Sequence, residues 1–242
     1  MSNGKIAIVD YNMGNLGSVF NAFVKVGASA ELVSDPDKLI NYDRVTLPGV
    51  GAFPDAMDHL HSNGMSDAIK EYSKSDRPLM GTCLGMQLLF DSSEEFGYSK
   101  GLGLIPGKVV AFDESKFDHK LKVPHMGWNE MFCRGLTSND LLQGNESFAG
   151  LTPTKSNDLL QGNESFAGLT PTKLFDGLPD DFYLYFVHSF HAVCDDRYAI
   201  GKTYYGYDFV SAVQNENIYG FQPHPEKSHD MGLKIIENFT KL

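Results

Sequence analysis

The stretch "RPLMGTCLGMQLLF", residues 77–90, decides the fold that we predict for this chain. Its first half reads as an apolar strand and its second half as the start of a helix. Cys83 stands at the junction, with Gly81 and Gly85 two residues to either side. This spacing is the thiol version of the G-x-S-x-G turn, which lifts a nucleophile above the carboxyl edge of a sheet. A single cysteine is more often a buried packing residue, but strand, paired glycines and helix together favour a nucleophile.

The sequence around this turn alternates strand and helix. The N-terminal half has strand-like runs before and after helical spacing at 15–26 and 54–74, which predicts an α/β fold with a mostly parallel central sheet and helices on both faces. The C-terminal half is richer in strands and ends in an amphipathic helix from about His229. The expected strands are 5–11, 29–34, 44–49 and 77–83, then 107–112, 182–190, 199–206, 209–214 and 218–224.

The composition limits the class of protein. The chain has 242 residues, 42% hydrophobic and 21% charged, with no linker, so we expect one domain over 1–242. A net charge of −11 argues against nucleic acid or an anionic membrane as partner, and no apolar run is long enough to span a bilayer. Three cysteines without C-x-x-C spacing argue against disulfides and a metal site and favour a cytoplasmic location.

A second segment with catalytic residue types is "GFQPHPEKS", residues 220–228. Residues i and i+2 of extended backbone point the same way, so Glu226 can hold the imidazole of His224. A cysteine nucleophile needs such a base and such an orienting carboxylate. The pair alone is a weak signal, because a histidine near the end of a chain is more often a surface residue. Together with Cys83 it predicts a Cys-His-Glu catalytic triad.

With these motifs in place, the chain resembles the class I glutamine amidotransferases, in which Cys, His and Glu occur in this order. Four further segments resemble the glutaminase subunits of imidazole glycerol phosphate synthase: "DYNMGNLGS", "LPGVGAF", "VPHMGWN" and "YFVHSF". The resemblance implies that Cys83 attacks the side-chain amide of glutamine, without a cofactor, while His224 transfers protons. It also implies an oxyanion hole at Val50 and Leu84, and a glutamine site at Gly49, Gly51, Gln87 and the backbone of His188, Ser189 and Phe190.

Glutaminase chemistry implies a partner, because free ammonia is protonated in water and the chain has no room for a synthase domain. The resemblance implies a heterodimer with a (β/α)₈-barrel cyclase, and a "PGVG" segment that switches the oxyanion hole when the partner binds its substrate. The expected interface residues are Asn15, Met126, Trp128 and Lys227. Two alternatives remain: a paralogous subunit that feeds a synthase acting on a nucleotide-sugar, and a partner-independent cysteine hydrolase or binding protein of the same fold.

Residues 138–155, "SNDLLQGNESFAGLTPTK", are repeated without change as residues 156–173. Two copies do not make a solenoid, which needs three or more to bury a continuous core. Each copy reads as a short helical turn followed by a loop. We therefore expect a tolerated surface insertion in an existing loop, rather than a part of the function. Damage to the partner interface and a gained contact are the alternatives.

Deleting residues 156–173 from the 242-residue chain leaves 224 residues. We expect the shorter chain to fold and to keep its activity, because doubling a loop changes the closure free energy by only about 0.6 kcal/mol. Urea unfolding of both chains measures this difference. A shorter chain that is less stable by several kcal/mol would show that the second copy is a structural element.

Overall fold

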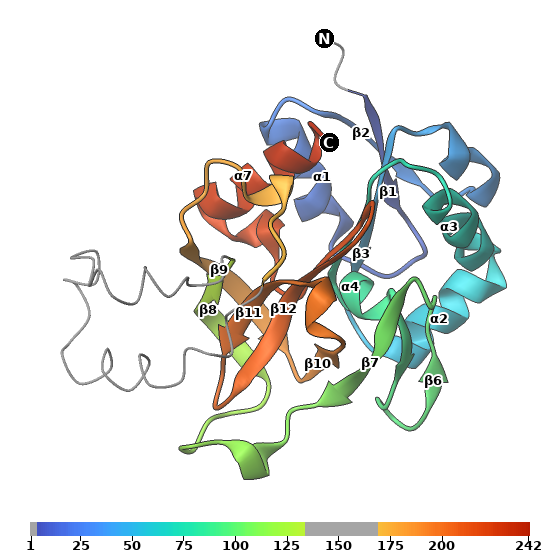
Figure 1. Cartoon of the computed structure of the whole chain (residues 1–242). Helices are drawn as coiled ribbons and strands as arrows, with labels where there is room; N and C mark the ends of the chain where they lie inside the picture. Colours follow the sequence, from blue (N-terminus) through green and yellow to red (C-terminus); the bar gives the residue numbers. More distant parts are fainter. Residues whose placement is uncertain (1–3, 134–168) are drawn as a thin grey trace.

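The computed structural model of the chain describes residues 4–133 and 169–242. Within these residues thirteen strands form one sheet, in the order β2-β1-β3-β4-β13-β12-β10-β7-β5-β6, with β11, β8 and β9 branching from β12 (Figure 1). The first five strands of this order are parallel, as the alternation of strands and helices predicted. The remaining pairs are antiparallel except β5 with β7.

The motifs at Cys83 and "PGVG" lie at the carboxyl edge of the parallel strands. They are β2 (Ser29–Val33), β1 (Lys5–Val9), β3 (Arg44–Gly49), β4 (Leu79–Cys83) and β13 (Ile218–Phe221). The other strands are β5 (Phe90–Ser93), β6 (Ser99–Lys100), β7 (Ile105–Ala111), β8 (His125–Phe132), β9 (Asp181–His188), β10 (Phe190–Val193), β11 (Ala199–Tyr204) and β12 (Asp208–Asn215).

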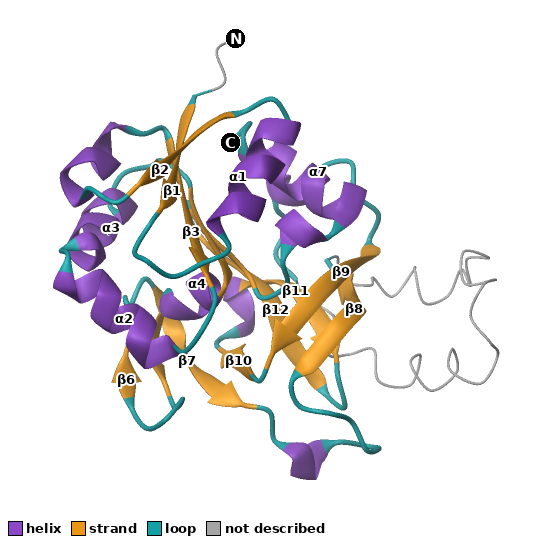
Figure 2. Cartoon of the chain, turned by 180° about the vertical axis from the view of Figure 1, so that it is seen from behind, coloured by secondary structure: helices purple, strands orange, loops and turns teal. Residues whose placement is uncertain are grey.

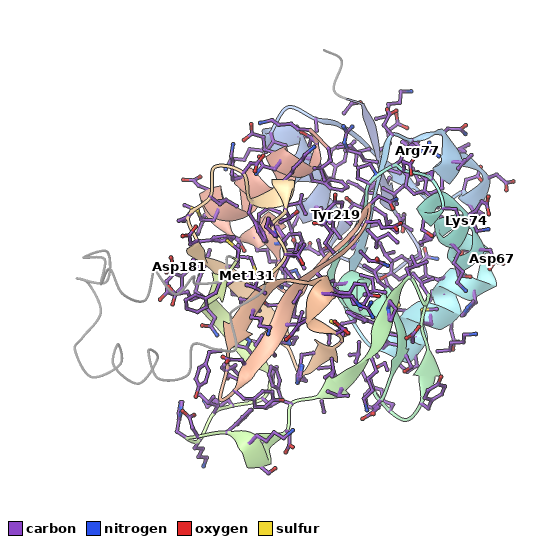
Figure 3. All side chains as sticks on the ribbon, in the orientation of Figure 1. Asp67, Lys74, Arg77, Met131, Asp181 and Tyr219 are labelled. Atoms are coloured by element: carbon purple, nitrogen blue, oxygen red, sulfur yellow. The ribbon has the colours of Figure 1, made fainter. Side chains whose placement is uncertain are left out.

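Helices cover the sheet on both faces (Figures 1 and 2). Strand β1 shows why: Ile6 and Ile8 belong to the buried cluster with α1 (Leu16–Lys25) and α7 (His229–Phe239). The alternate residues Ala7 and Val9 belong to the cluster with α2 (Phe53–Ser62) and α3 (Met65–Ser73). Side chains fill the space between the sheet and the helices on each face, whereas Asp67 and Lys74 point outward near α3 (Figure 3). A strand buried on both faces needs the continuous apolar run that residues 6–9 supply.

Several elements differ from the prediction, which lacks the short strands β5 and β6. The single helix expected over 54–74 is two helices, because Gly64 adopts φ +77° between them. The strand expected over 182–190 divides at Ser189 into β9, which pairs with β8, and β10, which pairs with β7 and β12. Strand β8 itself was not predicted, because its "HMGWNEMF" has glycine and polar residues and no clear alternation.

The turn after β4 fixes the position of Cys83. Cys83 has φ 54° and ψ −117°, a left-handed conformation that costs a non-glycine residue on the order of 1–3 kcal/mol. The two glycines are needed for close approach: a Cβ on Gly81 would lie 2.5 Å from the carbonyl oxygen of Gly85, and a Cβ on Gly85 would overlap that of Leu47. Helix α4 (Leu84–Leu88) therefore starts directly against the end of β3.

The duplicated segment lies mostly outside the described residues, so its predicted loop character stays a prediction. The described part is the end of the second copy, residues 169–173. Leu169 is buried in the core cluster of α2 and α3, and the N–H of Thr170 donates to the carbonyl of Ala199. The side chain of Thr172 caps a short 3-10 helix, Lys173–Phe175. Further 3-10 helices are Pro36–Asn41, Glu114–Lys116, Asp196–Tyr198 and Pro225–Lys227.

Replacing Gly85 by alanine should lower the free energy of unfolding by about 3 kcal/mol, because the new methyl group meets backbone that cannot move without separating α4 from β3. Gly17→Ala is the matched control, since nothing lies within 4 Å of its added Cβ; it should leave stability unchanged or raise it by up to about 1 kcal/mol. Urea denaturation measures both. Equal changes in the free energy of unfolding for the two substitutions would contradict the close approach of α4 to β3.

Candidate active site

The Cys83 thiol lies at the carboxyl edge of the parallel strands, in the turn that the sequence predicted. It is buried, and its contact with the carbonyl oxygen of Val187, at 3.9 Å, is a weak hydrogen bond. The helix that follows has only five residues, so its macrodipole is small. The free N–H groups of its first turn, beginning with Leu84, therefore matter more for anion binding than the whole helix does.

His224 and Glu226 meet as the sequence predicted, although the backbone that brings them together differs. Nδ1 of His224 lies 2.8 Å from Oε1 of Glu226, and both side chains are almost completely buried. His224 is extended, but Glu226 lies in the 3-10 helix Pro225–Lys227 rather than in a continuing strand. The contact therefore comes from a turn, and not from the alternation of an extended chain.

The loop that carries His224 is tied to strand β9 by two hydrogen bonds, and a third lies within the loop. The N–H of His224 donates to the carbonyl of Tyr185 at 2.8 Å. The hydroxyl of Ser228 donates to the carbonyl of His224 at 2.6 Å and accepts from the N–H of Tyr185 at 2.9 Å. Ser228 is buried, so this bridge is protected from water. Nothing in the sequence indicated this bridge, because a serine after a lysine near a chain end resembles any surface residue.

The protonation of His224 is set by its two neighbours. Burial lowers the pKa of His224, but the Cys83 thiol and the Glu226 carboxylate together raise it from 6.5 to about 10. Nδ1 of His224 is hydrogen-bonded to Glu226, and the buried Nε2 has no hydrogen-bond partner among the described residues. The imidazole therefore carries a proton at neutral pH, between the Glu226 carboxylate and the sulfur of Cys83.

A cavity of about 390 Å³ opens at Cys83. It brings together most of the residues expected to bind glutamine, which come from three separate parts of the chain. Its lining is Val50, Gly51, Cys83, Leu84, Gln87, Glu95, Phe96, Val187, His188, Ser189, Phe190 and His224. Gly49 is the one residue of the expected set that lies behind the cavity.

The two glycines of the "PGVG" segment are needed for different reasons: Gly49 for close packing and Gly51 for its backbone conformation. A Cβ on Gly49 would lie 2.7 Å from the N–H nitrogen of Gly85 and 2.8 Å from the hydroxyl of Tyr11, and Gly49 has no positive φ. Only Gly51 does, at φ +102°. Tyr11 supports the segment by donating its hydroxyl to the carbonyl of Pro48 at 2.9 Å. Burial, together with the nearby Cys83, raises the pKa of Tyr11, so this hydroxyl stays protonated.

The side chains of Gln87 and His188 are both engaged with the protein itself. Nε2 of Gln87 donates to the carbonyl of Phe190 at 3.0 Å and to Oε1 of Gln222 at 2.9 Å. Nδ1 of His188 lies 2.8 Å from the same Phe190 carbonyl. Ser189 and Phe190 thus border the cavity together with Gln87 and His188, whose side chains hold the Phe190 carbonyl in place.

Sequence reasoning missed Glu95 and Phe96, which line the cavity from the turn between β5 and β6. Oε2 of Glu95 accepts from the N–H of Phe53 at 2.8 Å, and partial burial raises the pKa of this carboxyl. The ring of Phe96 is 87% exposed at the rim, with φ 54°. The only available signal was the sequence "EEFGY", which reads as an ordinary polar turn.

The residues expected at a partner interface lie on the surface near the triad. Met126 and Trp128 are on the outer side of β8, 62% and 47% exposed, and the ring of Trp128 stacks on His229 with centroids 5.0 Å apart. Lys227 follows Glu226, and both line a second cavity of about 350 Å³ together with residues of α1. Asn15 precedes α1 and accepts a hydrogen bond from Ser18.

Residues 4–133 and 169–242 contain no group of three metal-ligating side chains. In the same residues no helix has the length and apolar character needed to cross a membrane.

A thiol at a strained turn, facing a histidine held by a carboxylate, defines a thiol hydrolase on an α/β sheet. The family model described as "Glutamine amidotransferase class-I" matches residues 7–242. Over 98% of its length the chain is 56% identical to the imidazole glycerol phosphate synthase subunit HisH of Sulfurimonas denitrificans, of which 97% is covered. It is 46% identical, again over 98% of its length, to the HisH subunit of Wolinella succinogenes, of which 99% is covered.

Two solved structures from Thermotoga maritima have the same fold at low sequence identity. The structure of PurLQS matches 98% of the chain at 17% identity with a TM-score of 0.66, and 97% of that chain is covered. A glutamine amidotransferase matches 93% of the chain at 15% identity with a TM-score of 0.55, and 77% of that chain is covered. The chain belongs to the class I glutamine amidotransferases and, within them, to the family of HisH subunits of imidazole glycerol phosphate synthase.

We expect His224 to titrate near pH 10, far above its ordinary value of 6.5. Because the folded-state pKa is raised, this group contributes stability that is complete below pH 6.5 and is lost as the pH rises through about 10. In Cys83→Ala the pKa should fall, because one of the two groups that raise it is removed. NMR of the histidine Cε1–H groups measures both values. Titration of wild-type His224 near 6.5 would contradict the ion-pair geometry.

Proposed function

We propose that Cys83, His224 and Glu226 hydrolyse the side-chain amide of glutamine, and that the chain works as the ammonia-donating subunit of imidazole glycerol phosphate synthase in histidine biosynthesis. One observation carries the proposal: the thiol at the strained turn opens into a cavity that also contains His224, whose other nitrogen is held by Glu226 at 2.8 Å. The family membership of the chain supports the choice of glutamine as substrate.

The reaction follows from the protons that these groups hold. His224 takes the proton of the Cys83 thiol, and the sulfur then attacks the amide carbon, so that the carbonyl oxygen of glutamine becomes an oxyanion. His224, protonated beside Glu226, gives its proton to the amide nitrogen, so that ammonia leaves and a glutamyl thioester remains. His224 then takes a proton from water, which attacks the thioester and releases glutamate. General acid and base help of this kind contributes roughly 10² to 10⁴ in rate.

We assign the oxyanion hole to backbone N–H groups at Leu84 and Val50. Leu84 is the first residue of α4, where N–H groups have no partner within the helix. Val50 lies on the other side of the cavity, next to Gly51, whose positive φ suits a peptide that can turn toward the thiol. Each such donor contributes about 10² to 10³ in rate.

The remaining lining suits the amino-acid end of glutamine. Glu95 is the acidic residue of the lining, and its carboxylate can pair with the α-ammonium group. The backbone of Ser189 and Phe190 can receive the α-carboxylate. Gln87 and His188 act through the Phe190 carbonyl that both contact.

The released ammonia requires an acceptor on a second chain, which we take to be a (β/α)₈-barrel cyclase. Exposed Met126 and Trp128 provide the aromatic and methionine surface that is enriched in protein interfaces. The second cavity reaches Glu226 from the side of Lys227, so a partner bound there would lie close to the triad. The cysteines of the described residues carry thiols, which suits a reducing compartment, and we place this work in the cytoplasm.

Cys83→Ala should abolish glutamate release from glutamine in the complex with a barrel cyclase and its nucleotide ligand, because no other group can form the thioester. Cys194→Ala is the matched control: burial, with Asp196 and Asp195 nearby, raises the pKa of Cys194 to about 12, so its thiol is unreactive and its loss should leave activity unchanged. Release of glutamate by the wild-type complex and not by Cys83→Ala supports the proposal. Equal turnover by both would refute it, and turnover that ignores the cyclase would refute the partner assignment.

A further inference from the structure

Two buried histidines have no part in the proton transfers described above. His125 and His188 are register partners at the paired ends of β8 and β9. Nδ1 of His125 lies 2.9 Å from Nε2 of His188, and Nδ1 of His188 lies 2.8 Å from the carbonyl oxygen of Phe190. The two imidazoles therefore form a continuous hydrogen-bonded path from strand β8 to the lining of the cavity at Cys83.

The direction of every hydrogen bond in this path follows from one carbonyl. The Phe190 oxygen can only accept, so Nδ1 of His188 donates, and Nε2 of a neutral His188 accepts. His125 must then donate from Nδ1 and accept at Nε2, where the amide of Asn129 lies 3.2 Å away. The orientation of this amide is fixed independently, because its nitrogen also donates to the Tyr204 carbonyl at 2.9 Å and its oxygen accepts from the N–H of Glu130 at 2.8 Å.

Both imidazoles are kept neutral by their surroundings. Burial lowers the pKa of His125 to about 4. Burial, and after it the neighbouring His125, lower the pKa of His188 well below its ordinary value. The path therefore has one arrangement of protons at neutral pH.

The far end of the path holds a part of the backbone that borders the cavity. Ser189 lies at the break between β9 and β10, so no single ladder of strand hydrogen bonds runs through this segment. The Phe190 carbonyl is instead fixed by two side-chain donors, Nδ1 of His188 and Nε2 of Gln87, which come from different elements. The Ser189 carbonyl accepts from the N–H of Phe112 at 3.1 Å, so the Phe190 carbonyl is the part of this backbone that the two side chains hold.

We propose that His125 and His188 are positioning residues for glutamine binding: their hydrogen-bonded path holds the Phe190 carbonyl, and with it the backbone that receives the amino-acid end of glutamine. This inference rests on the proposed function, because it takes the cavity at Cys83 as the glutamine site. The nitrogens of both imidazoles are engaged with protein groups and not with Cys83 or His224, so their loss weakens binding and leaves the chemical step in place.

Two substitutions at His125 separate this role from simple packing. The imidazole lies between two aromatic rings, with its centroid 4.8 Å from that of Phe186 and 4.0 Å from that of Tyr205. His125→Phe keeps an aromatic ring between them and removes the donor to His188. His125→Asn loses most of the ring contact but can place an amide N–H near the position of Nδ1. A packing role makes the asparagine variant the worse one, whereas the positioning role makes the phenylalanine variant the worse one.

The measurement is the KM and kcat of glutamate release in the complex with a barrel cyclase and its nucleotide ligand. His125→Phe should raise KM for glutamine about tenfold, with kcat within about twofold of wild type, because a buried acceptor on His188 loses its donor. His125→Asn should bring KM back to within about threefold of wild type. His191→Phe is the control: its nitrogens contact the Ala192 carbonyl and the Tyr207 hydroxyl, outside the path, so KM should not change.

A second measurement covers variants that fold poorly. Nitrogen-15 NMR of the wild-type chain should find both histidines neutral with the proton on Nδ1, and a proton on Nε2 of His188 would overturn the inference. So would an unchanged KM in a folded His125→Phe, or an asparagine variant weaker than the phenylalanine one. A wild-type complex that releases no glutamate overturns the proposed function and this inference together, whereas an active wild type with unchanged variants overturns the inference alone.

Discussion

The close approach between the end of β3 and the start of α4 is the constraint on which the site depends. Cβ atoms at Gly49, Gly81 or Gly85 would meet backbone from the neighbouring element. The two elements can therefore pack this closely only with glycine at these three positions. This approach holds Cys83 at φ 54° and places it beside Gly49 in the strand register. A strained nucleophile persists because the surrounding backbone leaves it no other conformation.

The remaining groups reach Cys83 because of the order of the parallel strands. Strand β4 lies between β3 and β13, so the segments that follow all three emerge at one edge of the sheet. The "PGVG" segment follows β3, and the loop of His224 follows β13. Ser228 ties that loop to β9, and the same strand delivers His188 to the back of the cavity. One sheet edge thus assembles parts that lie far apart in the sequence.

Histidines within this small region have opposite charge states for identifiable reasons. His224 has a carboxylate on one nitrogen and a thiol near the other, and these outweigh the cost of burial, so its pKa rises. His125 and His188 have each other, an amide and a carbonyl as partners, none of which is negatively charged, so burial prevails and their pKa falls. The first can move protons, whereas the other two can only hold neighbouring groups in place.

The sequence by itself determined the alternation of strands and helices, the turn at Cys83 and the pairing of His224 with Glu226, because each depends on residues close together in the chain. The sequence also identified the family, because the motifs typical of that family are short segments that can be recognised without a structure. Strand β8, the break at Ser189, the support from Tyr11 and Ser228, and the positions of Glu95 and His125 were decided only by the tertiary structure. Each of these depends on contacts between residues 37 or more positions apart, or on burial that no local pattern indicates. Hydrogen bonds in a buried site are fixed by what the fold brings opposite each group, and that is not a local property.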